Sequence, residues 1–292
     1  MTEERIIRFP AKDLPLRDDV STLGKLLGEV LVELHGPELL EQIEELRKTA
    51  IAGRESQAGV REQLGAHLAD LPLADAMLVI RAFSSYLRLA NLAEKVHRIR
   101  RRRDYLRNDE TEQRGSFEEV IRHFRDSGVS AADLQEVLND LQVQPVFTAH
   151  PTEATRRSIL EKEYSIIHRL VERLNTDRTP LEEARALARI RDAVTSGWQT
   201  RAVSASRPTV ADELDNILFY LTQILYRVVP PYLESLQEAL EKQYGDDVKL
   251  PTARPVLQFG SWVGADMDGN PNVTAATIRE TLSTQSSAII RC

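Results

Sequence analysis

VFTAHPTEATRRSIL, residues 146–160, joins a short apolar run to the start of a helix. The run VQPVFT at 143–148 is rich in β-branched and aromatic residues, which is typical of a strand. His150 follows this run directly and precedes a proline, so its position in a strand-to-helix loop is restricted. An imidazole titrates near neutral pH, so a fixed one suits proton transfer or stabilisation of an anion. Spacing alone leaves this role and a structural hydrogen bond within the loop equally open.

The helix that follows is predicted to open at Thr152 and Glu153 and to run to about Leu174. A threonine and a glutamate are favourable at a helix N-terminus, so capping alone explains both residues. Arg156 and Arg157 are predicted to lie in the early turns, where cations are normally disfavoured. Two adjacent guanidinium groups in such a place indicate a site for an oxyanion or a phosphate, with surface salt bridges as the alternative.

A second β-like run, VLQFG at 256–260, leads into the loop GSWVGADMDGNPNVT at 260–274. Trp262 is an apolar plate next to glycine and is able to line a small-molecule pocket. Asp266 and Asp268 are possible Mg²⁺ ligands, but capping of neighbouring amides is the favoured interpretation of both. A tight loop without a ligand is the alternative for the whole stretch, because Asp-Gly and Asn-Pro are common turn formers.

The rest of the chain is predicted to be mostly α-helical, with two short strands near 143–148 and 256–260. In each case a strand, an unusual loop and a helix follow one another, and in (β/α) barrels such loops build the active site. Two strands cannot close a barrel. We therefore predict an N-terminal helical region at 1–142, and at 143–292 the start of a TIM-like (β/α) barrel with helical insertions. Further barrel strands are expected beyond Cys292.

Local signals set the expected limits of several helices. Gly36-Pro37 is predicted to separate two helices of a hairpin, and a long helix is predicted over 73–107. Ser116 is predicted to cap a helix through a capping box with Glu119, and Thr179-Pro180 to start another. Pro230-Pro231 is predicted to kink or break a helix at 210–244, because proline lacks a donor and crowds the preceding turn. The basic run HRIRRRRDYLR at 97–107 is interpreted as a solvated helix end, with binding of an acidic partner or a phosphate as the alternative.

Composition excludes some classes of function. The net charge of -7 argues against a general nucleic-acid binder, since neutralising phosphates requires a basic surface. The chain has no run of eighteen apolar residues, which argues against a membrane span. One cysteine, Cys292, fits a reducing cytoplasm. The closing stretch TIRETLSTQSSAIIRC has no helix stop signal, so we expect the chain to be the front part of a longer protein.

Several motifs together resemble the phosphoenolpyruvate carboxylase family. VFTAHPTEATRR at 146–157 is similar to the family signature around its active-site histidine, and FGSWVGADMDGNPNVT at 259–274 is similar to a second family motif. WQTR at 198–201 and RPTVADE at 207–213 resemble the segment between them. There are two departures. Ala202 and Val203 stand near where many members carry an acidic pair, and Met267 stands where some members have arginine.

The resemblance implies an α-rich (β/α)-barrel enzyme, a cytoplasmic homotetramer that uses Mg²⁺ or Mn²⁺. Such an enzyme converts phosphoenolpyruvate and bicarbonate to oxaloacetate and phosphate through carboxyphosphate and the enolate of pyruvate. By resemblance, His150 removes the carboxyphosphate proton, and Trp262 walls the pocket around the substrate methylene group. Arg156 and Arg157 contribute to an anion site, either near the active centre or for a regulatory sugar phosphate.

Other parts of the family's site are not matched. Its second catalytic residue, a lysine, its metal-binding carboxylates and its Gly-rich arginine loop lie later in the family's chain. We therefore expect metal ligands beyond residue 292, and we expect residues 1–292 alone to form no oxaloacetate. Two other functions stay open: a non-catalytic helical scaffold or interaction protein, and another phosphoenolpyruvate-using barrel enzyme.

Overall fold

A computed structural model describes residues 9–55, 60–69, 71–107, 112–148, 156–200, 209–267 and 271–292. The chain forms two compact units, and each is built from two separate stretches of sequence. The first contains Met1–Arg103 and Ser158–Ala202, and the second contains Asp104–Arg157 and Val203–Cys292. The chain passes from one unit to the other after residues 103, 157 and 202, and the predicted boundary after residue 142 coincides with none of these three points. The assignment of 143–292 to a barrel stays a prediction.

The first unit is helical. After a short 3₁₀ turn, η1 (Ala11–Asp13), its elements are α1 (Leu14–His35), α2 (Pro37–Glu55), α3 (Val60–Ala69), α4 (Leu73–Arg107), most of α7 (Arg157–Glu172) and α8 (Pro180–Gln199). The predicted break at Gly36-Pro37 is confirmed. Gly36 has a φ of 89°, in the left-handed region that favours glycine, and Pro37 begins the next helix.

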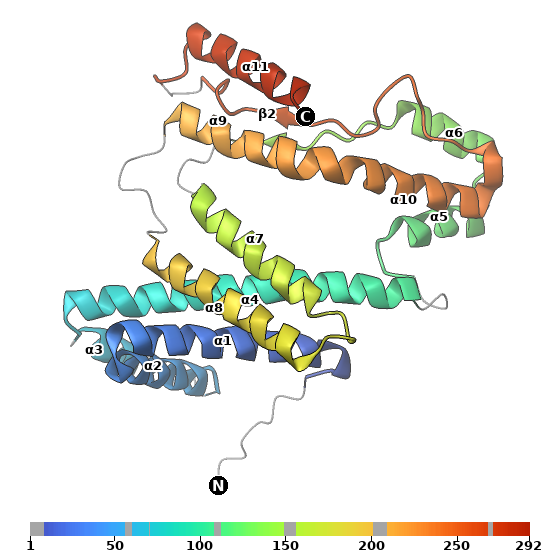
Figure 1. Ribbon diagram of the computed structural model, residues 1–292. Coiled ribbons are helices and arrows are strands. Elements are labelled where there is room, and N and C mark those ends of the chain that lie inside the picture. The colour runs from blue at the N-terminus through green and yellow to red at the C-terminus, as the bar shows by residue number, and fades with distance from the viewer. Residues whose placement is uncertain are drawn as a thin grey trace. The chain divides into compact units, whose positions relative to one another are not determined.

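The core of this unit forms where apolar stripes of α1, α4, α7 and α8 meet (Figure 1). It includes Leu23, Leu27, Val30, Val79, Leu92, Val96, Ile166, Leu170, Ile190, Val194 and Trp198. The spacing of Leu23, Leu27, Val30 and Leu31 gives α1 a single buried face, as expected for an amphipathic helix. Gly24 on this helix allows close packing, because a Cβ there would lie 3.2 Å from the Tyr86 ring of α4.

The basic run at the end of α4 is only partly solvated, which corrects the interpretation from sequence. His97 is buried with its Nε2 3.5 Å from an Asp13 carboxylate oxygen. Arg100 donates to Asp19 at 2.7 Å. These two acidic partners belong to η1 and α1, so the run contributes to packing within the unit as well as to the surface. Arg102 and other residues farther along α4 are exposed, as expected.

The second unit contains both strands. Its elements are α5 (Phe117–Asp126), α6 (Ala131–Asp140), β1 (Val146–Phe147), α9 (Val210–Phe219), η3 (Tyr220–Leu225), α10 (Tyr226–Tyr244), η4 (Gly245–Asp247), β2 (Gly260–Ser261) and α11 (Ala275–Ile290). α10 packs along α5, where the rings of Phe117 and Tyr232 meet edge to face at 4.9 Å. The predicted cap at Ser116 is confirmed, since its side chain accepts a hydrogen bond from the Glu119 amide.

Pro230-Pro231 is predicted from sequence to kink or break the helix. A break is wrong, because both prolines lie inside the continuous helix α10, and a kink stays a prediction. The carbonyl groups that two such prolines would crowd belong to Tyr226 and Arg227, four residues earlier in the helix. These residues directly follow the π-helical segment η3, whose register is set by a bond from the Tyr226 amide to the Leu221 carbonyl. A π-helical turn is wider than an α-helical one, so it is a place where a helix adjusts to proline.

No helix among the described residues combines the length and the apolar character that a membrane span requires.

Candidate active site

The two predicted strands lie side by side and run parallel. Val146 is paired with Gly260, and Phe147 with Ser261. An isolated bridge between Val143 and Leu257 extends the pairing towards the start of both runs. The second strand therefore reaches one residue beyond the predicted range of 256–260. Because parallel strands end at the same edge, the loops after residues 147 and 261 leave the pair next to each other.

Backbone hydrogen bonds bring Trp262 to the end of the first strand. The Trp262 amide donates to the Phe147 carbonyl at 2.8 Å, and the Gly260 amide donates to the Pro145 carbonyl at 3.0 Å. The Trp262 carbonyl then accepts from the amides of Ala265 and Asp266, both at 2.9 Å, which closes a turn. The main chain on both sides of the indole is thus fixed while 56% of the residue's surface stays exposed. This arrangement suits the predicted role of Trp262 as a pocket wall.

Two neighbours of Trp262 anchor the loop to helices. Val263 is buried against Leu214 and Ile217 of α9, together with Phe147 from the first strand. Gly264 has a φ of 74° and packs against buried Thr281 of α11. A Cβ at Gly264 would lie 2.1 Å from the Thr281 hydroxyl oxygen, so the close approach of loop and helix requires glycine here.

Arg157 is the first residue of α7, and the guanidinium lies 5.6 Å from the centre of the Phe219 ring on α9. A cation over an aromatic face at this distance is attracted by the ring, so Phe219 helps to orient the arginine. Arg156 is exposed and precedes the helix, whereas the sequence predicted both arginines in its early turns. The prediction is therefore confirmed for Arg157, which is the first residue of α7, and wrong for Arg156, which precedes the helix.

α9 is the common support of this region. Its buried side holds Val263 and Phe147, and its Phe219 contacts Arg157. A capping box fixes its start: the Thr209 hydroxyl accepts from the Asp212 amide at 3.2 Å, and Asp212 accepts from the Thr209 amide at 2.8 Å. The pKa of Asp212 is lowered, mainly by a hydrogen bond from the Thr209 hydroxyl and secondly by one from the Thr209 amide, so the carboxylate stays ionised.

His150, Thr152, Glu153 and Asp268 lie outside the described residues, so their predicted roles are not tested. In the sequence, His150 follows the last residue of the first strand, Phe147, by three positions. Asp266, the other possible Mg²⁺ ligand, is described by the structure. Among the described residues, no group of three or more His, Cys, Asp or Glu side chains is arranged to hold a metal ion.

Sequence analysis missed the two side chains that hold the candidate site in place, Phe219 and Thr281. Phe219 stands in a long helical pattern where an aromatic residue is expected simply to be buried. Thr281 stands in a helix among other threonines and serines. The available signal for Thr281 was the glycine at 264, since a glycine in a loop often marks a close approach of another segment.

Comparison with known proteins places this sequence in a family. The family model for phosphoenolpyruvate carboxylase matches residues 16–292. A phosphoenolpyruvate carboxylase of Xanthomonas euvesicatoria is 48% identical over 283 residues, which are 97% of this chain and 31% of that protein. Those of Paraburkholderia xenovorans and Pseudomonas aeruginosa are 39% and 38% identical, over 95% and 94% of this chain and 28% and 31% of theirs. The chain thus spans about a third of the length of these relatives, and it belongs to the phosphoenolpyruvate carboxylase family.

Proposed function

We propose that this chain supplies part of the active site of a phosphoenolpyruvate carboxylase, which forms oxaloacetate and phosphate from phosphoenolpyruvate and bicarbonate. The observation that carries the proposal is the parallel strand pair, because the His150 motif and the Trp262 motif follow directly after its two strands in the sequence. Both loops have the motifs of the family, and the family match covers nearly the whole chain.

The proposed reaction has three steps. A bicarbonate oxygen attacks the phosphorus of phosphoenolpyruvate, and the bond from phosphorus to the enol oxygen breaks, which gives carboxyphosphate and the enolate of pyruvate. His150 then removes the carboxyphosphate proton, so that the bond from carbon to the bridging oxygen breaks and yields CO₂ and phosphate. The methylene carbon of the enolate finally attacks CO₂, and phosphate takes up the proton held by His150.

Trp262 and the two arginines would act through position and charge. The exposed indole would cover the methylene carbon, and excluding water there protects the enolate from protonation. Arg156 and Arg157 would attract an anion, either the substrate phosphate or a regulatory sugar phosphate. The contact of Arg157 with Phe219 supports a fixed direction for one of them.

The family also implies Mg²⁺ or Mn²⁺, which supplies positive charge to the transferring phosphoryl group. The described residues of this chain do not form a cluster suited to such an ion. No step above is therefore assigned to the metal, and its ligands are proposed to lie beyond residue 292.

The architecture we propose for the whole enzyme is a (β/α) barrel that begins with β1 and β2, with 1–142 as a preceding helical region. Parallel pairing of the strands and a helix after each of them support this proposal. A cytoplasmic homotetramer is proposed from the family resemblance alone.

A chimeric enzyme tests the proposed function. Residues 1–292 would replace the matching third of the Xanthomonas euvesicatoria relative, and oxaloacetate and phosphate would be assayed separately with and without bicarbonate. The chimera should form both products only with bicarbonate. The variant His150→Asn should lose oxaloacetate formation, while bicarbonate-dependent phosphate release should fall less, because His150 is proposed to act after the phosphoryl transfer.

A matched control is His168→Asn, since His168 is an exposed residue of α7 whose ring lies 3.2 Å from the Glu172 carboxylate. This variant should keep nearly full activity. Unchanged oxaloacetate formation in a folded His150→Asn chimera would rule out the assigned role. Phosphate release without any need for bicarbonate would instead favour a different phosphoenolpyruvate-using enzyme, and a folded chimera that forms neither product would favour a scaffold.

A further inference from the structure

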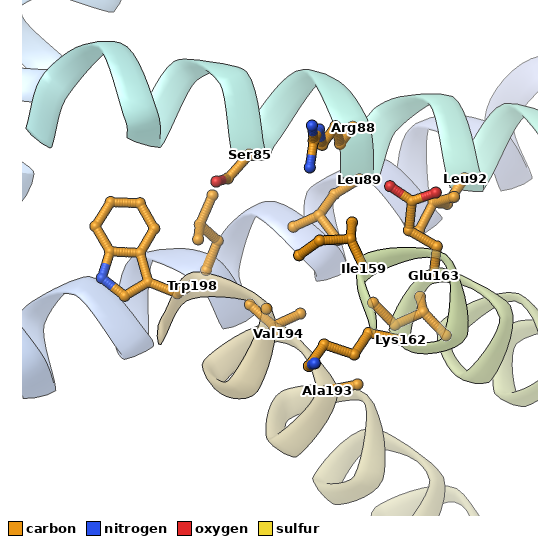
Figure 2. A pocket seen from close by; sticks show the side chains of 13 residues that line it. Ser85, Arg88, Leu89, Leu92, Ile159, Lys162, Glu163, Ala193, Val194 and Trp198 are labelled. Carbon is orange, nitrogen blue, oxygen red and sulfur yellow. The ribbon is translucent and has the colours of Figure 1, made fainter. Parts of the chain in front are cut away.

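The first unit contains a pocket of its own. It is lined by residues of α4, α7 and α8 and by Leu27 of α1, and Figure 2 shows labelled side chains of α4, α7 and α8 around it. None of Trp262, Arg156 and Arg157 lines it, and each of its lining residues belongs to the first unit. A ligand of this pocket would therefore be distinct from the substrates proposed above.

The floor of the pocket is apolar and well fixed. Leu92, Ile159 and Ile166 are buried there, and Trp198 is only 4% exposed. The Trp198 indole N–H donates to His35 Nε2 at 2.9 Å, and the Arg81 guanidinium lies 4.6 Å from the centre of its ring, so its position is fixed. The cavity volume is about 60 Å³. One ordered water needs about 10–15 Å³, so there is room for about four to six water-sized groups.

Two side chains of opposite charge line the rim of the pocket, and neither has a partner among the residues that the structure describes. Arg88 of α4 and Glu163 of α7 both line the pocket, and neither forms a hydrogen bond or an ion pair with any residue that the structure describes. Lys162 differs, because its ammonium donates to the Ser158 carbonyl at 3.1 Å. Figure 2 shows Arg88 and Glu163 on different helices above the apolar floor.

We propose that this pocket binds a free α-amino acid with an aliphatic side chain, of the size of valine or leucine. The Arg88 guanidinium would donate hydrogen bonds to the carboxylate, and the Glu163 carboxylate would accept from the ammonium group. A side chain of three or four carbons would fill the apolar floor. A simple carboxylate would leave Glu163 without a partner, and a simple amine would leave Arg88 without one. Only a ligand with both charges and an apolar end satisfies all three parts of the pocket.

Fluorescence of residues 1–292 can test this proposal, because this sequence contains two tryptophans, Trp198 and Trp262. In a Trp262→Phe background, emission comes from the pocket residue Trp198. L-leucine at millimolar concentrations should change this emission in a saturable manner, and calorimetry on the unaltered chain should give the same affinity. 4-Methylpentanoate lacks the amine and isoamylamine lacks the carboxylate, so each should bind at least about tenfold more weakly than leucine.

Two variants assign the charges, and a third serves as a control. Arg88→Gln should weaken leucine binding about tenfold and remove the advantage of leucine over isoamylamine. Glu163→Gln should remove its advantage over 4-methylpentanoate. Arg102→Gln removes an exposed cation from the same helix and should change nothing.

Either of two results would overturn the proposal. One is the absence of saturable leucine binding to the unaltered chain by both methods. The other is equal binding of leucine and its two analogues. This comparison uses no pocket variant, so it remains a valid test even if Arg88→Gln or Glu163→Gln fails to fold. Leucine affinity that is unchanged in both folded variants would also contradict the assignment.

Discussion

Gly264 is the residue at which the Trp262 loop is most sensitive to a small change. Replacing Gly264 by Ala adds one carbon, which would lie 2.1 Å from the Thr281 hydroxyl oxygen, 2.9 Å from its methyl carbon and 3.0 Å from its Cβ. Thr281 is itself 4% exposed, so it has little room to move away. The φ of 74° adds a second cost, because side chains disfavour left-handed backbone.

The two costs have separate magnitudes. A left-handed conformation costs an alanine about 1–2 kcal/mol, and an extra methyl group in a packed region costs about 1–3 kcal/mol. Gly264→Ala should therefore lower the free energy of unfolding by about 2–5 kcal/mol. Adding Thr281→Ala removes the hydroxyl and the methyl but leaves the Cβ, so the double variant should recover only part of the packing cost.

A matched control is available in the same unit. Gly128 has a φ of 82°, and a Cβ there would meet nothing within 4 Å, so Gly128→Ala isolates the backbone cost. Urea unfolding would be followed through Trp262 in a Trp198→Phe background, in which emission reports the second unit. If Gly264→Ala costs no more than Gly128→Ala, or if Thr281→Ala gives no favourable coupling, the packing described for this loop is wrong.

Two further predictions concern pairs of residues within one unit. Asp19 is buried between Arg100 at 2.7 Å and Arg173 at 3.8 Å. Asp19→Ala should therefore lower the free energy of unfolding in urea by about 3 kcal/mol, and Arg100→Ala should lower it less when Asp19 is already absent. Strictly additive effects of the two substitutions would contradict this pairing. Because the pKa of Asp212 is lowered in the folded chain, its contribution is present above about pH 3.9 and lost as pH falls through the lowered value. Asp212→Asn should therefore reduce the loss of stability in acid, whereas an unchanged acid limb would contradict the cap with Thr209.

Sequence analysis located the helix limits that depend on neighbouring residues. Gly36-Pro37, Ser116 and Thr179-Pro180 act within one turn, so the signal and the structure that it forms lie in the same few residues. Thr179 illustrates this directly, since its hydroxyl accepts from the Glu182 amide and Glu182 accepts from the Thr179 amide. Such signals carry the same meaning in any fold, which is why no tertiary information was needed.

The features that sequence analysis missed depend on residues far apart in the chain. A π-helical turn directly precedes the helix that contains Pro230 and Pro231, and no local rule predicts this turn from YLTQIL. The two-part composition of each unit results from packing of α7 and α8 on α1 and α4, which a pass along the sequence does not detect. The pairing of His97 and Arg100 with acidic residues of the first turns has the same origin.

The candidate site combines both kinds of information. The two motif loops were evident from composition, and the parallel strand pair confirms that they begin side by side. The position of Trp262, however, is set by its neighbours: Val263 is buried on α9, and Gly264 is packed on α11. Both helices begin with capping boxes, at Thr209 and Thr274, so local signals fix the supports while long-range packing fixes the loop.

Trp262 and the two residues that follow it are constrained in different ways. The Trp262 residue is exposed, and its backbone is fixed by hydrogen bonds, so a new side chain at 262 should have little effect on the loop itself. The next two residues are constrained in the opposite way, because Val263 and Gly264 are buried and the second has no room for a Cβ. Val263 and Gly264 therefore support the loop, whereas Trp262 beside them can vary without displacing the main chain at the strand end.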